Sequence, residues 1–173
     1  MVYAIASGTG RDFVSIAGFA PTITVADSPL QSFRNQVSSD WEALTPPDRT
    51  TVKYHEVDGA RFLAGSAGAR SFTFDVPERS EPIGQAGCAA TQVDWIQPIQ
   101  VRIPKRGRSE AGHVDAANNE INLLARRIEL RGAWPTGVLE VHTEEAVPDR
   151  DEETKGDTVY VLTCRVLCNE TGS

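Results

Sequence analysis

The chain has 173 residues, of which 40% are hydrophobic and 24% are charged, and this composition excludes a wholly disordered protein. Seventeen Lys and Arg against 24 Asp and Glu give a net charge of −7, which disfavours tight nucleic-acid binding, because phosphate neutralisation supplies most of that affinity. The apolar stretches are far shorter than the ~20 residues that cross a bilayer, so neither a membrane span nor a signal peptide is expected. Three cysteines, Cys88, Cys164 and Cys168, favour a reducing compartment over a disulfide framework.

Residues 1–27 differ in composition from the rest of the chain. They hold one Arg and two Asp, and glycines and Pro21 interrupt their short β-prone pieces. This pattern favours an extended N-terminal arm or an edge hairpin that gains order through contacts with another chain. No linker divides the remainder, so we expect a single domain over residues 28–173.

The first helix is predicted over residues 29–44. Ser28 supplies a capping hydroxyl, and Pro29 suits the first helical position. Pro46 and Pro47 end the helix, because a residue before proline is disfavoured in the α region. Five apolar residues recur at helical spacing and form one stripe: Leu30, Phe33, Val37, Trp41 and Leu44.

Three strands are predicted next, over residues 51–57, 71–76 and 91–103. In the second strand, Phe72, Phe74 and Val76 share one face and alternate with polar residues. In the third strand, Pro98 predicts an edge position, a bulge or a break, because proline cannot donate to a ladder. Gln97 is the one polar residue on an otherwise apolar face of that strand.

The second helix is predicted to follow a polar loop at residues 104–113, with Asp115 as its cap and Gly132 at its end. Its end carries three cations that suit a helix C-terminus: Arg126, Arg127 and Arg131. Two strands follow, over residues 138–143 and 158–168. The second of them is apolar on both faces, as expected for a central strand covered on both sides. This order predicts an α+β fold, with two helices on one face of a mostly antiparallel mixed sheet of about five strands.

The residues that commonly carry chemistry form no recognisable constellation. His55, His113 and His142 lack zinc-site spacing, and the glycine-rich pieces lack a P-loop lysine. His142 beside Glu144 and Glu145 is compatible with an acid–base pair, but a solvated strand end is the favoured interpretation. Cys164 and Cys168 are interpreted as small core residues on one strand face. We predict no catalytic residue, cofactor or metal.

Charge is separated along the chain. The connector at residues 144–157 has a net charge of −5, from two bases and seven acids: Glu144, Glu145, Asp149, Asp151, Glu152, Glu153 and Asp157. An opposite cluster contains Arg102, Lys105, Arg106 and Arg108. One interpretation is that both clusters are solvated loops. The other is a subunit or tube interface, in which the two clusters meet on neighbouring copies, because a head-to-tail ring needs two different complementary patches.

The order of elements over about residues 28–170 resembles the tail terminator (tail completion) proteins of long-tailed bacteriophages. The features that carry the resemblance are the early helix ending in proline, the second helix DAANNEINLLARRIEL, Trp134-Pro135, and the closing strand TVYVLTCRVLCNE. Residues 1–27 and the loop at 78–90 depart from that pattern.

The resemblance implies a non-enzymatic virion protein, assembled in the host cytoplasm, that forms a homohexameric ring. Such a ring caps the tail tube protein, ends tail elongation and offers a surface to the head connector or stopper proteins. DNA passes through its lumen without specific binding, and net acidity suits that role because it repels DNA. A different neck ring protein, a cytosolic small-molecule-binding module and a hydrolase with an unrecognised triad remain as alternatives.

Overall fold

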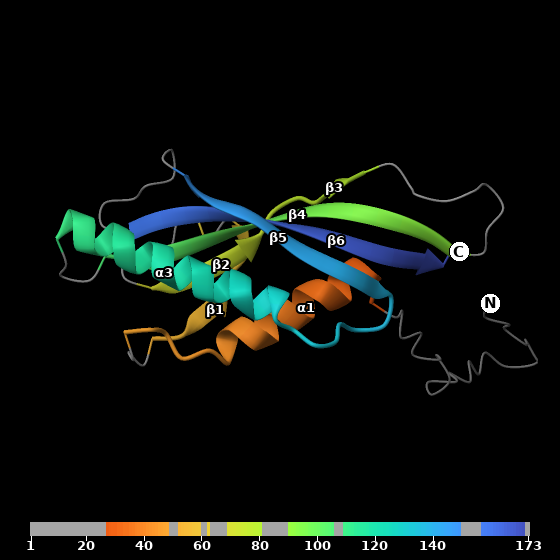
Figure 1. Ribbon diagram of the computed structural model, residues 1–173, viewed down its shortest axis with the longest axis horizontal. Coiled ribbons are helices and arrows are strands. Elements are labelled where there is room, and N and C mark those ends of the chain that lie inside the picture. The colour runs from red at the N-terminus through yellow and green to blue at the C-terminus, as the bar shows by residue number, and fades with distance from the viewer. Residues whose placement is uncertain are drawn as a thin grey trace, which may run out of the picture.

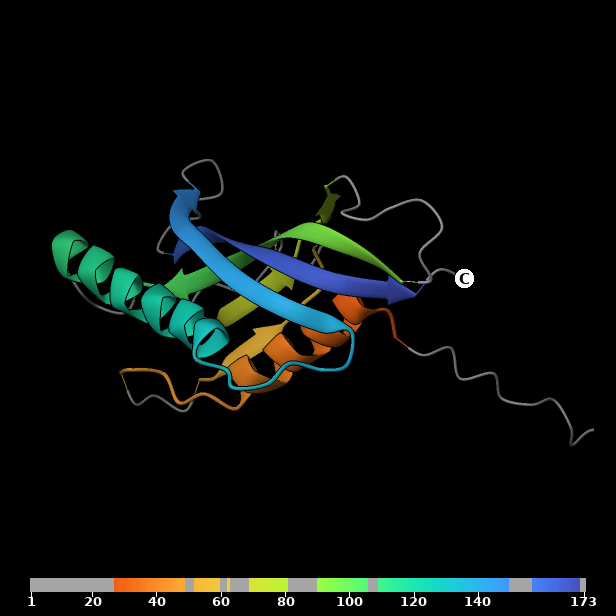
Figure 2. The same ribbon diagram turned by 45° about the vertical axis from the view of Figure 1, so that its right-hand side comes forward.

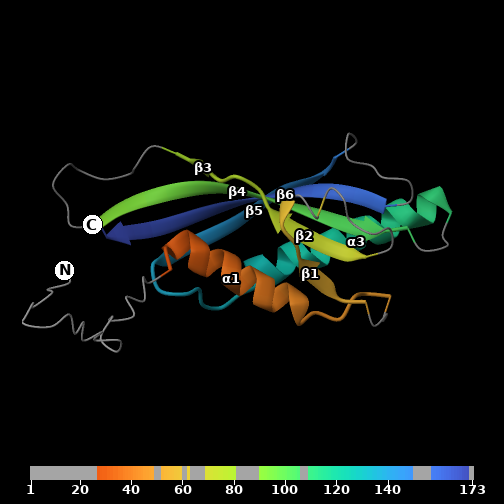
Figure 3. The same cartoon turned by 180° about the vertical axis from the view of Figure 1, so that it is seen from behind.

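Six strands and two helices make up the described part of the computed structural model, which covers residues 27–48, 52–59, 62, 69–80, 90–105, 109–149 and 157–171. In chain order these are α1 (Pro29–Glu42), β1 (Tyr54–Glu56), β2 (Arg70–Phe74), β3 (Glu78–Arg79), β4 (Ala90–Pro104), α3 (Glu110–Glu129), β5 (Val138–Asp149) and β6 (Asp157–Thr171). The strand order is β1-β2-β4-β6-β5, with β3 paired to β4. Both helices lie on one face of the sheet (Figures 1 and 3).

The pairing of the described strands confirms the predicted α+β class. β1 runs parallel to β2, and the other described pairs are antiparallel. The sheet has one strand more than expected because β3, only two residues long, falls in a segment that was predicted to be a loop. The two predicted helices are both present.

Helix α1 begins as its sequence predicts. The Ser28 hydroxyl accepts a hydrogen bond from the Gln31 amide at 3.2 Å, and Pro29 occupies the first turn. The helix ends at Glu42, two residues before the predicted end, and the Leu44 amide then bonds to the Trp41 carbonyl at 3.0 Å. Leu44, the last residue of the predicted apolar stripe, still packs against the core although it lies beyond the end of the helix.

Helix α3 begins earlier than predicted. Ser109, not Asp115, is its N-cap, and the Ser109 hydroxyl accepts from the Gly112 amide at 3.3 Å. Asp115 is an exposed residue within the helix. His113 was predicted in a loop, but it lies in the first turn of α3, where its Nε2 is 2.7 Å from the Thr158 hydroxyl. Ser109 is an equally good capping residue, and the buried side chain of His113 holds this first turn against the sheet.

Strand β4 is continuous through Pro98, so of the three predicted alternatives (an edge position, a bulge or a break) the break is absent. Every residue of β4 has a partner in β6, including Pro98 opposite Thr163. On the other side of β4, pairing with β2 reaches Ile99, and pairing with β3 reaches Ile96. Pro98 therefore lies at the junction between two partner strands, where its carbonyl accepts from the Asp75 amide at 3.0 Å. A residue without an N–H is tolerated at such a junction.

Strand β5 continues well beyond its predicted end at Thr143 and reaches Asp149. Two register shifts, at Val138/Glu140 and Thr143/Ala146, interrupt its pairing with β6. Pro148 is accommodated because β5 is the last strand of the sheet path. The connector between β5 and β6 is accordingly shorter than predicted.

The predicted core is confirmed. α1, α3 and the helix-facing side of the sheet enclose one apolar cluster in which Phe33, Trp41, Phe72, Leu124 and Leu162 are fully buried. On β6, the helix-facing residues Tyr160, Leu162, Cys164, Val166 and Cys168 are all buried. The opposite face of β6 was predicted to be covered as well. It is only partly so, because Val159 is buried whereas Val161 and Leu167 are half-buried.

The turn between α3 and β5 requires glycine at position 137. Gly137 has φ +91°, and a Cβ there would lie 2.8 Å from Cγ of Pro29. The Asn169 amide donates to the Gly137 carbonyl at 2.7 Å. This turn therefore brings the start of α1 against the end of β6.

Candidate functional site

The predicted basic cluster is not a continuous surface, because Arg102 is buried. Only 1% of its side chain is exposed, and its Nη1 lies 3.9 Å from the Asp157 carboxylate. Its guanidinium lies 5.0 Å from the centre of the Phe62 ring, and Nη2 donates to the Phe62 carbonyl. Arg102 and Asp157 were assigned to opposite exposed clusters. They instead form an internal pair, because their strands are neighbours and Phe62 packs against the Arg102 guanidinium.

The other predicted interface residues are placed only in part. Lys105 is half-buried and Glu144 is exposed. Glu145 and Asp149 belong to β5, although their side chains are outside the described set. Five predicted residues lie outside the described ranges: Arg106, Arg108, Asp151, Glu152 and Glu153.

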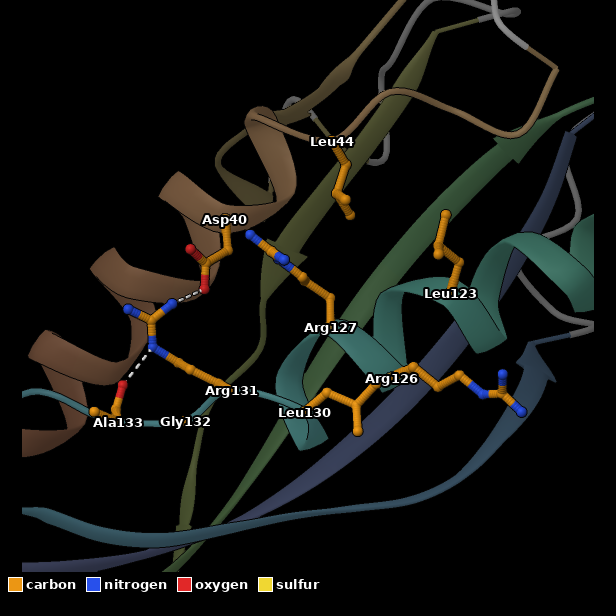
Figure 4. Close-up of a pocket in the computed structure, with 9 residues that line it drawn as sticks. All are labelled: Asp40, Leu44, Leu123, Arg126, Arg127, Leu130, Arg131, Gly132 and Ala133. Carbon is orange, nitrogen blue, oxygen red and sulfur yellow. Dashed lines mark hydrogen bonds and ion pairs between the residues drawn. The ribbon is translucent and has the colours of Figure 1, made fainter.

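A cleft of about 670 Å³ opens between α1 and the C-terminal end of α3 (Figure 4). Nine residues line it, mostly arginines and leucines: Arg126, Arg127, Arg131, Leu44, Leu123, Leu130, Asp40, Gly132 and Ala133. We call this surface the arginine cleft. It was not predicted, because Arg126, Arg127 and Arg131 were interpreted only as cations suited to a helix end. One signal in the sequence could have indicated it. Leu123 and Leu130 lie off the helical face of α3 that carries the buried residues Ile121, Leu124 and Ile128.

Arg131 forms one wall of the cleft. Its Nη1 donates to the Asp40 carboxylate of α1, and its Nε donates to the Ala133 carbonyl at 2.7 Å. Its guanidinium also lies 5.4 Å from the centre of the Trp134 ring. These contacts satisfy Arg131 and join the end of α3 to α1.

Arg126 and Arg127 are the available cations of the cleft. Both side chains are exposed, and neither makes an ion pair or hydrogen bond within the part of the chain that the structure describes. Arg127 points into the space between the helices, whereas Arg126 points away from α1 (Figure 4). Leu130, 82% exposed, lies beside them. Guanidinium groups bind carboxylates with paired hydrogen bonds, so this surface suits an acidic segment that also carries an apolar side chain.

A second polar group lies inside the molecule, around Arg70. Its guanidinium donates to Glu120 of α3, to Asp48 at 2.8 Å and to the Val52 carbonyl at 3.1 Å. The Tyr54 hydroxyl donates to the same Glu120 carboxylate at 2.5 Å. Burial, together with the Glu120 charge, raises the pKa of Tyr54 above its ordinary range. These bonds tie β1 and β2 to α3, which is a structural role.

The histidines are dispersed. His55 is exposed on β1, and His142 Nε2 lies 2.9 Å from Glu140 Oε1 with both side chains more than half exposed. His142 is thus a solvent-exposed strand residue beside Glu140, in agreement with the favoured interpretation of a solvated position. Among the described residues, no group of three or more His, Cys, Asp or Glu is placed to hold a metal ion, and neither helix is long and apolar enough to span a membrane. Cys164 and Cys168 are buried in the core, as predicted.

No protein-family model matches this chain, and a search of curated proteins finds no similar sequence. Function is therefore inferred from the fold and from its surfaces. Two surfaces stand out among the described residues: the arginine cleft and the outer strand β5, where Leu139 and Val147 are 48% and 57% exposed.

Proposed function

We propose that this protein is a structural subunit of a long-tailed bacteriophage virion that forms a hexameric ring on the tail tube. The ring would end tail elongation and provide the joining surface for the head connector. The proposal rests on the resemblance in element order and on the assembly surfaces described above. It makes the protein a non-enzymatic component whose partners are its own copies, the tube protein and the connector.

The observation that carries the proposal is the exposed outer strand β5. It has 12 residues, and among the described strands it pairs only with β6. A long edge strand presents unpaired backbone groups that favour contacts with other chains. Leu139 and Val147 add exposed apolar surface to the same strand, and such surface is typical of interaction sites. These features favour a subunit of an assembly over an isolated binding module.

The charge of the chain is consistent with a DNA conduit. A net charge of −7 disfavours tight binding of the phosphate backbone. A ring through which DNA passes has to avoid holding it, and repulsion between like charges serves this purpose.

The test is reconstitution with purified tail tubes. We expect the protein to bind one end of each tube and to prevent further addition of tube protein, as seen by electron microscopy and tube-length distributions. Native mass spectrometry of the capped ends should give six copies. Tubes that lengthen equally with and without the protein would contradict the proposal. Saturable binding of a small molecule by a monomer would instead support the binding-module alternative.

A further inference from the structure

Building on the proposed ring, we propose that the arginine cleft of one subunit binds the acidic end of β5 from a second copy of this chain. We define the acidic hairpin as residues 144–156, which begins in the second half of β5. The contact joins two different patches and is therefore head-to-tail, the kind of interface that closes into a ring.

The charges of the two patches are complementary. Because Asp157 is buried against Arg102, the acidic hairpin retains six acids against two bases, a net charge of −4. The cleft presents Arg126 and Arg127, which have no ion-pair partner among the described residues. A guanidinium–carboxylate contact is charge-assisted and can be bidentate, so each arginine can donate to one hairpin carboxylate.

The apolar surfaces of the two patches also match. Val147 is 57% exposed and lies between Glu144 and Asp149 in the sequence. In the cleft, Leu130 is 82% exposed and lies close to both arginines. Contact between Val147 and Leu130 would bury both side chains and place acids next to guanidinium groups. Burial of this kind is favourable by roughly 25 cal/mol per Å² of apolar surface.

The geometry directs this contact to another copy. The Thr143 hydroxyl donates to Glu129 at the end of α3, and β5 then runs six more residues to Asp149, about 20 Å at the strand rise. The Asp149 end of β5 curls away from both helices (Figure 2). The described end of β5 is thus directed away from the arginine cleft of the same subunit.

The experiment compares two charge-reversed variants. In the cleft variant, Arg126→Glu is combined with Arg127→Glu. In the hairpin variant, Asp149→Lys, Glu152→Lys and Glu153→Lys are combined. Sedimentation and native mass spectrometry at low salt should show higher oligomers for the wild type and monomers for each variant, with self-association weakened tenfold or more. Lys53→Glu, which reverses an exposed charge before β1, is the control and should assemble like the wild type.

Mixing the variants tests whether the interface is head-to-tail. In a mixture, the normal hairpin of the cleft variant fits the normal cleft of the hairpin variant, and the two reversed patches are complementary as well. The mixture should therefore regain higher oligomers that contain equal numbers of the two variants. A chain that carries both sets of reversals should assemble again. Unchanged assembly of the cleft variant, or a wild type that stays monomeric at low salt and on tail tubes, would overturn the inference.

The outcomes also separate this inference from the proposed function. Oligomers that depend on Arg126 and Arg127 but never cap tail tubes would retain the interface and reject the tail role. Capping by a hexamer that is insensitive to both reversals would retain the tail role and reject the interface. The midpoint of thermal unfolding should change little in the cleft variant, because Arg126 and Arg127 are exposed and exposed charges contribute little to stability.

Discussion

Arg70 and Glu120 form a buried ion pair that joins β2 to α3, although the two residues are 50 positions apart in the sequence. Only 2% of the Arg70 side chain and 5% of the Glu120 side chain are exposed. Burial alone would lower the pKa of Arg70, but its hydrogen bonds to Glu120 and Asp48 raise it above the usual value. The guanidinium therefore remains charged inside the protein, and its carboxylate partners become essential.

Removal of Glu120 should strongly destabilise the fold. Glu120→Ala leaves the Arg70 charge buried with one carboxylate fewer, and breaking such a pair costs about 3–5 kcal/mol. The control is Asp115→Ala, at an exposed position of the same helix, which should change the free energy of unfolding by less than about 0.5 kcal/mol. Urea unfolding of both variants checks this. Equal stabilities would contradict a role for the pair.

Gln97 should be another sensitive polar residue. It is fully buried, accepts from Arg34 Nε at 2.8 Å, and donates to the carbonyls of Asp75 at 2.9 Å and Pro98 at 2.7 Å. Gln97→Leu would leave these partners unsatisfied, at a cost of about 2–4 kcal/mol. Gln100→Leu on the same strand, where the amide makes one exposed hydrogen bond, should cost under about 1 kcal/mol. Chemical denaturation that ranks the two variants the other way would reject this assignment.

Trp41 should contribute through packing alone. Its side chain is fully buried against Phe72, with ring centres 5.0 Å apart, and its indole N–H has no hydrogen-bond partner among the described residues. Trp41→Ala should cost about 3–5 kcal/mol, whereas Trp41→Phe should cost no more than about 2 kcal/mol because no hydrogen bond is lost. Thermal and urea unfolding measure both. A larger loss for the phenylalanine variant would show that the indole N–H has an essential partner.

Stability should fall at alkaline pH. Burial raises the pKa of the Cys164 thiol from its ordinary 9.0, and burial also raises the pKa of the Tyr54 hydroxyl from its ordinary 10.0. Both groups stay protonated in the folded protein at pH values where they ionise in the unfolded chain. Their contribution is therefore complete below pH 9 and decreases as the pH rises, by up to about 1.4 kcal/mol per pH unit for each group. Unfolding free energies measured from pH 8 to 10.5 should show this, and Cys164→Ala should flatten the slope that begins near pH 9.

Deletion of residues 1–20 should leave the folded domain intact and weaken assembly. The described apolar core is formed by residues between Leu30 and Cys168, and the deletion removes none of them. Circular dichroism and thermal unfolding of the truncated protein should match the full chain, while its oligomers dissociate at lower salt. A truncated chain that fails to fold would show that residues 1–20 belong to the domain.

Features that depend on local pattern could be predicted from the sequence. The stripe that begins at Leu30 and ends at Leu44 predicted α1 and its buried face, because helical spacing places these side chains on one side. The apolar face of β2 and of β4, and the two apolar faces of β6, predicted the sheet in the same way. Together they indicated the α+β class and the composition of the core.

Features that depend on neighbours distant in sequence could not be predicted. Pro98 is accommodated because β2 and β3 meet at that point of β4, and Ser109 became the cap of α3 because His113 lies against β6. The arginine cleft exists only where the ends of two helices come together. The sequence determined which face of each element is apolar, but the tertiary structure decided whether each charge is exposed. Arg102 is the clearest case, because its burial depends on Phe62 and Asp157, which only the folded sheet brings to its side.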